Sequence, residues 1–245
     1  MNSKKTIVSF IIFVAVIIAG VFVFQSYKEN KIENMSGLLK KITIEDKKIE
    51  DNTKPFKINV VYPQIPDAEE FNQIARDLVN KEIDNFKNNS LENDSSVAET
   101  DPENYASYPR EYELNISYEK GDDLDNNIIS IVFNIYSFEG GAHGASYFIP
   151  LNYNLKTKSK IALGDIFKNQ PNYVQKISEF CIKDLTSQIT SKLGNTEGTW
   201  IEQGAGLEEE NFAVFLINKK NIVFYFPQYQ VAFGAAGDFR VSMPR

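Results

Sequence analysis

The sequence predicts an α+β fold: an antiparallel sheet with two main helices, preceded by one N-terminal transmembrane helix. Three patterns lead to this prediction. Residues 7–24 are apolar apart from Ser9 and Gly20, and a helix of that length spans about 27 Å, close to the hydrocarbon thickness of a bilayer. Farther along the chain, strand patterns come in runs instead of alternating strictly with helices, which is typical of α+β domains. Two stretches, 67–87 and the one after Pro171, carry apolar residues at helical spacing.

The apolar segment 7–24 determines the expected topology. Lys4 and Lys5 precede it, whereas the charges that follow it cancel, so the positive-inside rule assigns residues 1–6 to a cytoplasmic tail. We therefore expect a single-pass protein of the cell membrane whose C-terminal domain is extracytoplasmic. A cleaved signal peptide and a buried helix are the alternatives. Signal peptides usually have a shorter apolar region that ends in a small-x-small site, and that pair is missing here.

Beyond the anchor, we expect three further parts. Residues 25–37 are polar and form a short stalk. The ectodomain then divides into an N-terminal part, 38–130, and a C-terminal part, 131–245.

Composition and charge exclude several classes of function. The chain has 26 basic and 33 acidic side chains, a formal net charge of −7 and a pI of about 5.0, so it lacks the basic surface of a nucleic-acid binder. Without Lys4 and Lys5 the exported part carries about −9, which favours a cationic partner. A single Cys and a single His exclude an intrachain disulfide and a zinc site built from Cys and His alone. We expect no cofactor and no metal.

The N-terminal part of the ectodomain is expected to contain a helix after its first strands. Asp67 is expected to cap this helix, which runs to about Lys87. Residues 88–108 are rich in Asn, Asp, Glu and Ser and indicate a long surface loop. Two strands are expected before the helix, a weak one at 38–44 and a half-buried one at 54–62 that Pro63 and Pro66 end.

The remaining chain is expected to be mainly strands around a second helix. After Pro171, that helix carries an apolar stripe that includes Cys181, which is predicted to be a buried small hydrophobe and not a reactive thiol. A glycine-rich loop, 194–206, contains the single Trp. The predicted strands are 111–119, 129–135, 147–155, 212–217, 222–226 and 239–243.

Four short motifs carry a family resemblance. They are GGAHG at 140–144, YNLKTK at 153–158, LGDIF at 163–167, and FYFPQYQVA at 224–232 followed by AAG at 235–237. In this order they resemble the family catalogued as domain of unknown function 3298, with its usual N-terminal neighbour 4163. That pair forms the extracytoplasmic part of RsiV-type anti-sigma factors and the non-catalytic region of PdaC-type peptidoglycan deacetylases. The resemblance covers 130–245 well and 38–130 in outline, and for RsiV-type members it implies a surface that binds lysozyme.

Five residues are candidates for ligand binding. The glycines of the GGAHG motif permit positive φ and close backbone approach. His143 is suited to present its imidazole to a ligand, and the alternative is that it fixes the loop by a backbone hydrogen bond. Trp200 is suited to stack on a sugar ring or anchor a protein partner, and the alternative is a lid over the sheet edge. The candidates are Gly140, Gly141, His143, Trp200 and Tyr229.

These observations together favour a binding module over an enzyme. A lone His with no nucleophile near it in the sequence is weak support for catalysis. We expect a membrane-anchored extracytoplasmic module of the bacterial cell envelope that binds lysozyme or another cationic protein, or a wall glycan such as peptidoglycan fragments. The alternatives are a peptidoglycan-modifying hydrolase or deacetylase-like enzyme centred on His143, and a structural spacer.

Overall fold

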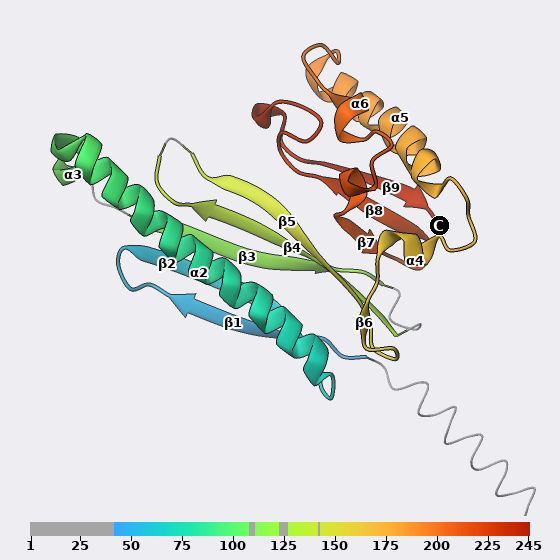
Figure 1. Ribbon diagram of the computed structural model, residues 1–245, viewed down its shortest axis with the longest axis horizontal. Coiled ribbons are helices and arrows are strands. Elements are labelled where there is room, and N and C mark those ends of the chain that lie inside the picture. The colour runs from blue at the N-terminus through green and yellow to red at the C-terminus, as the bar shows by residue number, and fades with distance from the viewer. Residues whose placement is uncertain (1–41, 108–110, 123–126, 142) are drawn as a thin grey trace, which may run out of the picture. The chain divides into compact units, whose positions relative to one another are not determined.

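Two β-sheets, each covered by a helix, make up the computed structural model of the protein (Figure 1). The structure describes residues 42–107, 111–122, 127–141 and 143–245. The expected tail, anchor and stalk all lie outside the described residues. Within the described ranges, no helix is both long and apolar enough to cross a bilayer.

The larger sheet has six strands that follow one another in chain order. Its neighbours are antiparallel except for β2 and β3, which run parallel. The expected purely antiparallel sheet is therefore wrong at this pair, because helix α2 carries the chain back before β3 begins, and parallel neighbours need such a crossover. The strands are β1 (Glu45–Asp51), β2 (Phe56–Gln64), β3 (Tyr112–Lys120), β4 (Ile128–Phe138), β5 (Ala145–Asn154) and β6 (Ser159–Lys160).

The first strand, β1, differs from its prediction at 38–44. It begins at Glu45, while 42–44 have no regular structure and 38–41 lie outside the described residues. Its sequence, EDKKIED, is highly charged, which suits a strand at the edge of a sheet. Pro63 also lies inside β2 and does not end it. The pairing of β2 with β3 involves only 56–60, so the missing N–H of Pro63 removes no ladder bond on that side.

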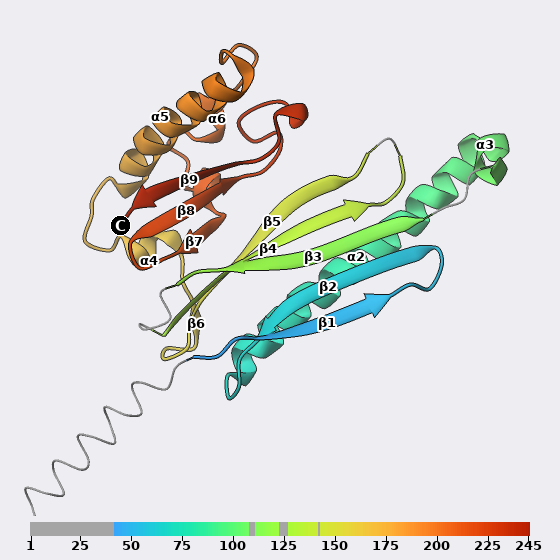
Figure 2. The ribbon, with the colours of Figure 1, turned by 180° about the vertical axis from the view of Figure 1, so that it is seen from behind.

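Helix α2 (Glu69–Thr100) crosses one face of the larger sheet, in front of the strands in Figure 1 and behind them in Figure 2. The predicted loop at 88–108 is wrong, because α2 continues to Thr100 and α3 (Pro102–Ser107) follows. Polar side chains of this stretch form hydrogen bonds within α2 and with the neighbouring sheet. Ser90 is fully buried and donates to the Phe86 carbonyl at 2.7 Å. Asp94 accepts from Tyr112 of β3 at 2.7 Å, so contacts across the fold outweigh local composition.

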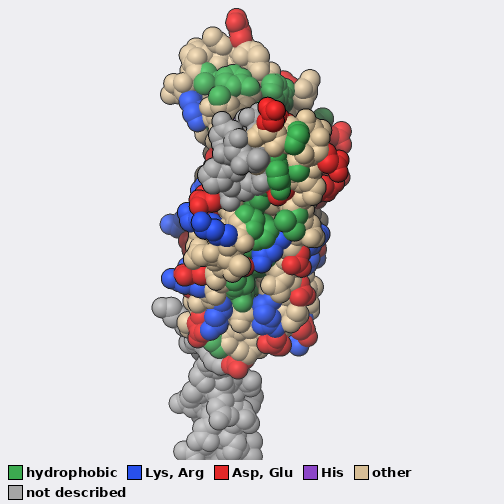
Figure 3. Space-filling model, turned by 90° about the vertical axis from the view of Figure 1, so that its left-hand side faces the viewer, with side chains coloured by type: hydrophobic (Ala, Val, Ile, Leu, Met, Phe, Trp, Pro, Cys, Tyr) green, Lys and Arg blue, Asp and Glu red, His purple; other side chains and the backbone are tan. Residues whose placement is uncertain are grey.

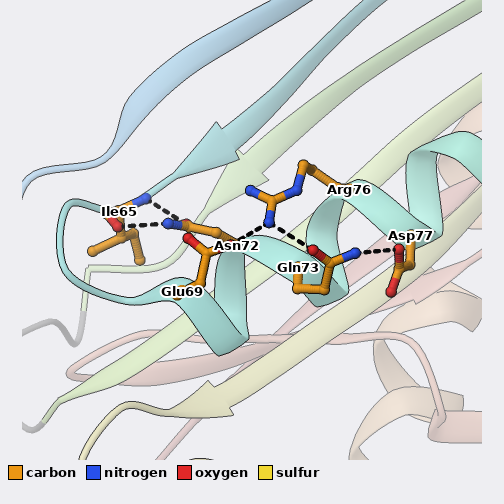
Figure 4. A network of polar contacts seen from close by, with 6 residues as sticks. All are labelled: Ile65, Glu69, Asn72, Gln73, Arg76 and Asp77. Atoms are coloured by element: carbon orange, nitrogen blue, oxygen red, sulfur yellow. Dashed lines mark hydrogen bonds and ion pairs between the residues drawn. The ribbon is translucent and has the colours of Figure 1, made fainter.

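Asn72 stabilises the start of α2 (Figure 4). Its side chain accepts from the Ile65 N–H and donates to the Ile65 carbonyl, each at 2.8 Å, and only 7% of the residue is exposed. The prediction that Asp67 caps the helix is wrong, because the cap position is Ala68 and no side chain caps it. Arg76 pairs with Glu69 and donates to Gln73 on the exposed side of the same turn.

The smaller sheet has three antiparallel strands, and the sequence did not predict that the strands divide between two sheets. Helix α5 (Tyr173–Leu193) confirms the predicted second helix and covers the side of this sheet that faces away from the larger one (Figures 1 and 2). Cys181 is fully buried in α5, as predicted, and burial raises the pKa of its thiol to about 12. The other elements are α4 (Leu163–Ile166), α6 (Ile201–Gly204), η2 (Glu209–Phe212), β7 (Phe215–Ile217), β8 (Asn221–Phe226), η3 (Gly234–Ala236) and β9 (Phe239–Pro244).

Each sheet has its own apolar core, and a small cluster of Val132, Leu216 and Tyr225 joins the two. Buried hydrogen bonds reinforce this junction. The Ser130 hydroxyl accepts from the Ile217 N–H at 2.7 Å and donates to the Asn152 side chain at 2.5 Å. Asn152 in turn donates to the Phe215 carbonyl at 3.1 Å.

Gly121 brings the two sheets close together at the end of β3. Its N–H donates to the Ser130 carbonyl at 2.8 Å. A Cβ atom added at Gly121 would lie 2.0 Å from the Ile217 carbonyl oxygen, so no larger residue fits there without moving β7. Residue 130, the expected division of the ectodomain, falls inside β4.

Candidate functional site

The loop between β4 and β5 contains the GGAHG motif. Gly140 and Gly141 have φ of 99° and 94°, so the expectation that they adopt positive φ is confirmed. Gly144 serves a different purpose, because a Cβ atom added there would lie 2.6 Å from the Tyr136 ring. The loop therefore packs closely against an aromatic side chain that is itself 38% exposed.

His143 is exposed, and its Nδ1 atom lies 3.1 Å from the Gly144 carbonyl oxygen. This is the backbone contact that one reading of the sequence expected. Within the described ranges, no carboxylate or hydroxyl group bonds to the imidazole, and no cluster of three or more His, Cys, Asp or Glu side chains is arranged to hold a metal. A general base normally needs a partner that orients it, so the geometry around His143 gives no support for catalysis.

The structure brings together the other two candidates, Trp200 and Tyr229. The Trp200 indole N–H donates to the Tyr229 carbonyl at 2.8 Å. The Trp200 backbone N–H donates to the Val231 carbonyl at 3.0 Å. Trp200 itself is half-buried, whereas 60% of Tyr229 and 40% of Phe233 are exposed. We call Trp200, Tyr229 and Phe233 the aromatic platform.

The loop between β8 and β9, which carries Tyr229 and Phe233, is held firmly, whereas Trp200 lies directly before α6, a short helix inside the expected glycine-rich loop. The Gln230 side chain donates to the carbonyls of Gly204 and Asn211, each at 2.8 Å. Tyr229 has a φ of 69°, a conformation that costs energy for a non-glycine residue and is often found at binding sites. Its ring lies over Gly234, where an added Cβ atom would be 2.2 Å from the ring. The backbone of the loop is therefore fixed, and the ring that it carries lies against Gly234 with most of its surface exposed.

Phe233 is the platform residue that the sequence did not single out. The aromatic residues of the terminal motif differ in exposure only because of the fold, since Phe224 and Phe226 face the core. Tyr229 and Phe233 lie on the loop before β9, Trp200 lies directly before α6, and the GGAHG motif lies on the loop before β5. In the described chain, no hydrogen bond or ring contact joins the two candidate regions.

Charge is mixed on the face shown in Figure 3. Over its lower half, Lys and Arg side chains alternate with Asp and Glu side chains, and hydrophobic side chains are exposed toward its upper end. The net negative charge of the chain is thus not gathered into one continuous acidic field on that half.

Comparison with protein families gives two matches. Residues 49–146 match the family described as "Deacetylase PdaC", and residues 164–245 match the protein of unknown function family DUF3298. The chain is therefore similar to a PdaC-type region followed by a DUF3298 domain. This confirms the resemblance that the motifs indicated. His143 lies in the PdaC-type region, whereas all three residues of the aromatic platform lie in the DUF3298 domain.

Two curated relatives are similar to the chain over part of their own length. The peptidoglycan-N-acetylmuramic acid deacetylase PdaC of Bacillus subtilis is 27% identical over 192 residues, which cover 78% of this chain and 38% of that protein. An esterase of Mycobacterium tuberculosis is 25% identical over 116 residues, which cover 47% of this chain and 48% of the esterase. The chain therefore spans less than half the length of either relative.

Two solved structures of the DUF3298 family are similar to the chain. A member from Bacteroides fragilis matches with a TM-score of 0.50 and 17% identity, over 83% of this chain and 88% of that one. A member from Pseudomonas aeruginosa matches with a TM-score of 0.49 and 14% identity, over 84% and 92%. The Bacteroides structure supports the α+β fold of the chain.

Proposed function

We propose that this chain is a binding module of the bacterial cell envelope, anchored in the membrane by residues 7–24, whose aromatic platform binds the glycan of peptidoglycan. The observation that carries the proposal is Tyr229, whose exposed ring lies against Gly234 on a loop that the Gln230 side chain holds in place. An aromatic ring that keeps one face open to solvent is suited to stack on the apolar face of a sugar. Because the backbone of this loop is already ordered, binding would not have to order it.

The relative from Bacillus supports the choice of ligand. Its name describes an enzyme that acts on N-acetylmuramic acid in peptidoglycan, and the shared segment covers 38% of its length. Whether such a module is attached to an enzyme or acts alone, it needs the same contact with the glycan. In this proposal, the chain binds the polymer without modifying it.

The experiment measures retention of the full-length protein, in mild detergent, on purified insoluble peptidoglycan. We expect Tyr229→Ala to weaken retention about fivefold, since one stacked ring contributes about 1 kcal/mol. Gly234→Ala keeps the ring but forces it out of its position, because the new Cβ would overlap it, and we expect a similar loss. Leu207→Ala is the matched control, since Leu207 is 67% exposed and has no ring.

Two results would count against the glycan proposal. Absence of retention of the unmodified protein at any salt concentration would refute it. Equal retention of the unmodified protein and Tyr229→Ala would show that the platform is not the contact surface.

A second candidate partner is a cationic protein such as lysozyme, which the charge of about −9 on the exported part favours. The same protein is passed over immobilised lysozyme at low and high salt. Attraction between net charges predicts retention at low salt that disappears at high salt and is insensitive to Tyr229→Ala. Stacking on glycan predicts little dependence on salt.

The names of the two curated relatives, a deacetylase and an esterase, make an enzyme the competing function. It is tested by release of acetate from acetylated peptidoglycan. Our proposal expects no release by the unmodified protein above a blank without protein. Release that disappears in His143→Ala, with unchanged retention on peptidoglycan, would establish the enzyme instead.

A further inference from the structure

A pocket of about 500 Å³ lies where the two sheets meet. One wall is the end of β5, residues 150–152, and another is the segment 160–163 that leaves β6. Glu209 and Glu210 of η2 also line the pocket, together with Ala213 and Phe215. This volume falls within the roughly 300–1,000 Å³ that is usual for small-molecule sites.

The walls of the pocket are fixed by contacts beyond it. Asn152 is buried and bonded on both sides of its amide, to Ser130 and to the Phe215 carbonyl. The Tyr173 hydroxyl donates to the Glu209 carboxylate at 2.5 Å. The Ala162 N–H donates to the Asp165 carboxylate at 3.0 Å. The pocket is therefore preformed, and a ligand would not have to order its walls.

Two opposite charges that line the pocket are unpaired. Lys160 and Glu210 are exposed, and neither has an ion pair or a side-chain hydrogen bond within the described ranges. A neighbouring hollow of about 430 Å³ also includes Lys160 but differs in its other charges. There Lys158 and Glu70 already pair at 2.9 Å, and Tyr153 donates to Glu70 at 3.3 Å. Of the two, the larger pocket is therefore the one whose lining has charged side chains without an ion-pair partner among the described residues.

We propose that this pocket binds the free ends of a zwitterionic amino acid or short peptide, with its ammonium group at Glu210 and its carboxylate at Lys160. A ligand with both charges satisfies both side chains, whereas a simple anion would be repelled by Glu210 and by the Glu209 carboxylate, and a simple cation would be repelled by Lys160. Leu151, Ile161 and Phe215 supply apolar surface for the part of the ligand between the charges. This site is separate from the aromatic platform, so the inference does not depend on glycan binding.

The test is calorimetric titration of the full-length protein with three versions of trialanine: the free zwitterion, the N-acetylated form and the C-terminal amide. We expect the zwitterion to bind and each blocked form to bind about fivefold or more weakly, since each lacks one charge-assisted hydrogen bond at a partly exposed site. The variants Lys160→Gln and Glu210→Gln identify which residue recognises which end. Lys160→Gln should no longer distinguish the acid from the amide, and Glu210→Gln should no longer distinguish the amine from its acetylated form.

Matched controls are Lys156→Gln and Glu208→Gln, which remove the same charges from exposed positions outside the pocket. Both should bind the zwitterion like the unmodified protein. The inference is overturned if the zwitterion does not bind, if blocking either end has no effect, or if the control variants weaken binding as much as the pocket variants. Binding of trialanine together with failure of retention on peptidoglycan would refute the proposed function alone.

Discussion

The two halves of the described chain bury their cores in different ways. In the N-terminal half, one long helix covers one face of a six-stranded sheet, and most of the core comes from alternating strand residues. In the C-terminal half, α5 covers a three-stranded sheet, and most of the core comes from helices and connecting segments instead of strands. The cluster that joins the two cores has three buried residues. The difference indicates that each half is stabilised mainly by its own core, and the candidate aromatic residues of the C-terminal half lie on the segments between its strands.

The largest expected effect comes from truncating one core at a time. Phe71→Ala in the first half and Phe224→Ala in the second each remove a fully buried ring and should each lower the free energy of unfolding by about 3–5 kcal/mol. Unfolding in urea is followed by the fluorescence of Trp200, the only Trp, and by circular dichroism. We expect Phe224→Ala to lower the fluorescence midpoint and Phe71→Ala to leave it nearly unchanged. Equal shifts would show that the halves unfold as one unit.

A smaller effect is expected at the junction. Ser130→Ala removes the acceptor for the buried Ile217 N–H and a donor to Asn152, which should lower stability by about 1–3 kcal/mol. The control is Ser187→Ala on the exposed side of α5, which should change stability by less than about 0.5 kcal/mol. Thermal unfolding measures both. If the two variants behaved alike, the hydrogen bonds of Ser130 would not be what connects the halves.

The smallest effect concerns acid stability of the N-terminal half. The Thr53 backbone N–H, together with Lys87, lowers the pKa of Asp51 from 3.8 to about 2. Since the pKa is lower in the folded state, Asp51 contributes stability above about pH 4, and this contribution is lost as the pH falls toward 2. In Asp51→Asn, the melting temperature should therefore fall less steeply over this pH interval than in the unmodified protein. Parallel curves for the two proteins would contradict this assignment.

The sequence predicted the elements whose pattern is local. Helix α5, the buried Cys181 and strands β3, β4, β5, β8 and β9 follow from alternation and helical spacing. The predicted strand at 212–217 is shorter, because Phe212 ends η2 and β7 begins at Phe215, and the two-residue strand β6 was not predicted. The parallel pairing of β2 with β3 could not be predicted from the sequence, since it depends on where α2 places the start of β3. The length of α2 was missed for a related reason: its polar residues are satisfied by partners such as Tyr112, 18 positions from Asp94.

The candidate surfaces also divide into features that the local sequence reveals and features that depend on the fold. The sequence singled out Trp200 and Tyr229 as aromatic residues of expected loops, but their contact joins positions 29 apart. Phe233 has no local signal that separates it from the buried phenylalanines nearby. The pocket between the sheets combines three distant segments, 150–152, 160–163 and 209–215, and no spacing in the sequence reveals it.

Gly121 restricts which amino-acid substitutions this fold can accept. The backbone of β7 occupies the position that a side chain at 121 would need, so even a methyl group would have to push one sheet away from the other. A selection for stable variants from a randomised library should therefore recover glycine at 121 almost alone, while the exposed strand β1 accepts many residues.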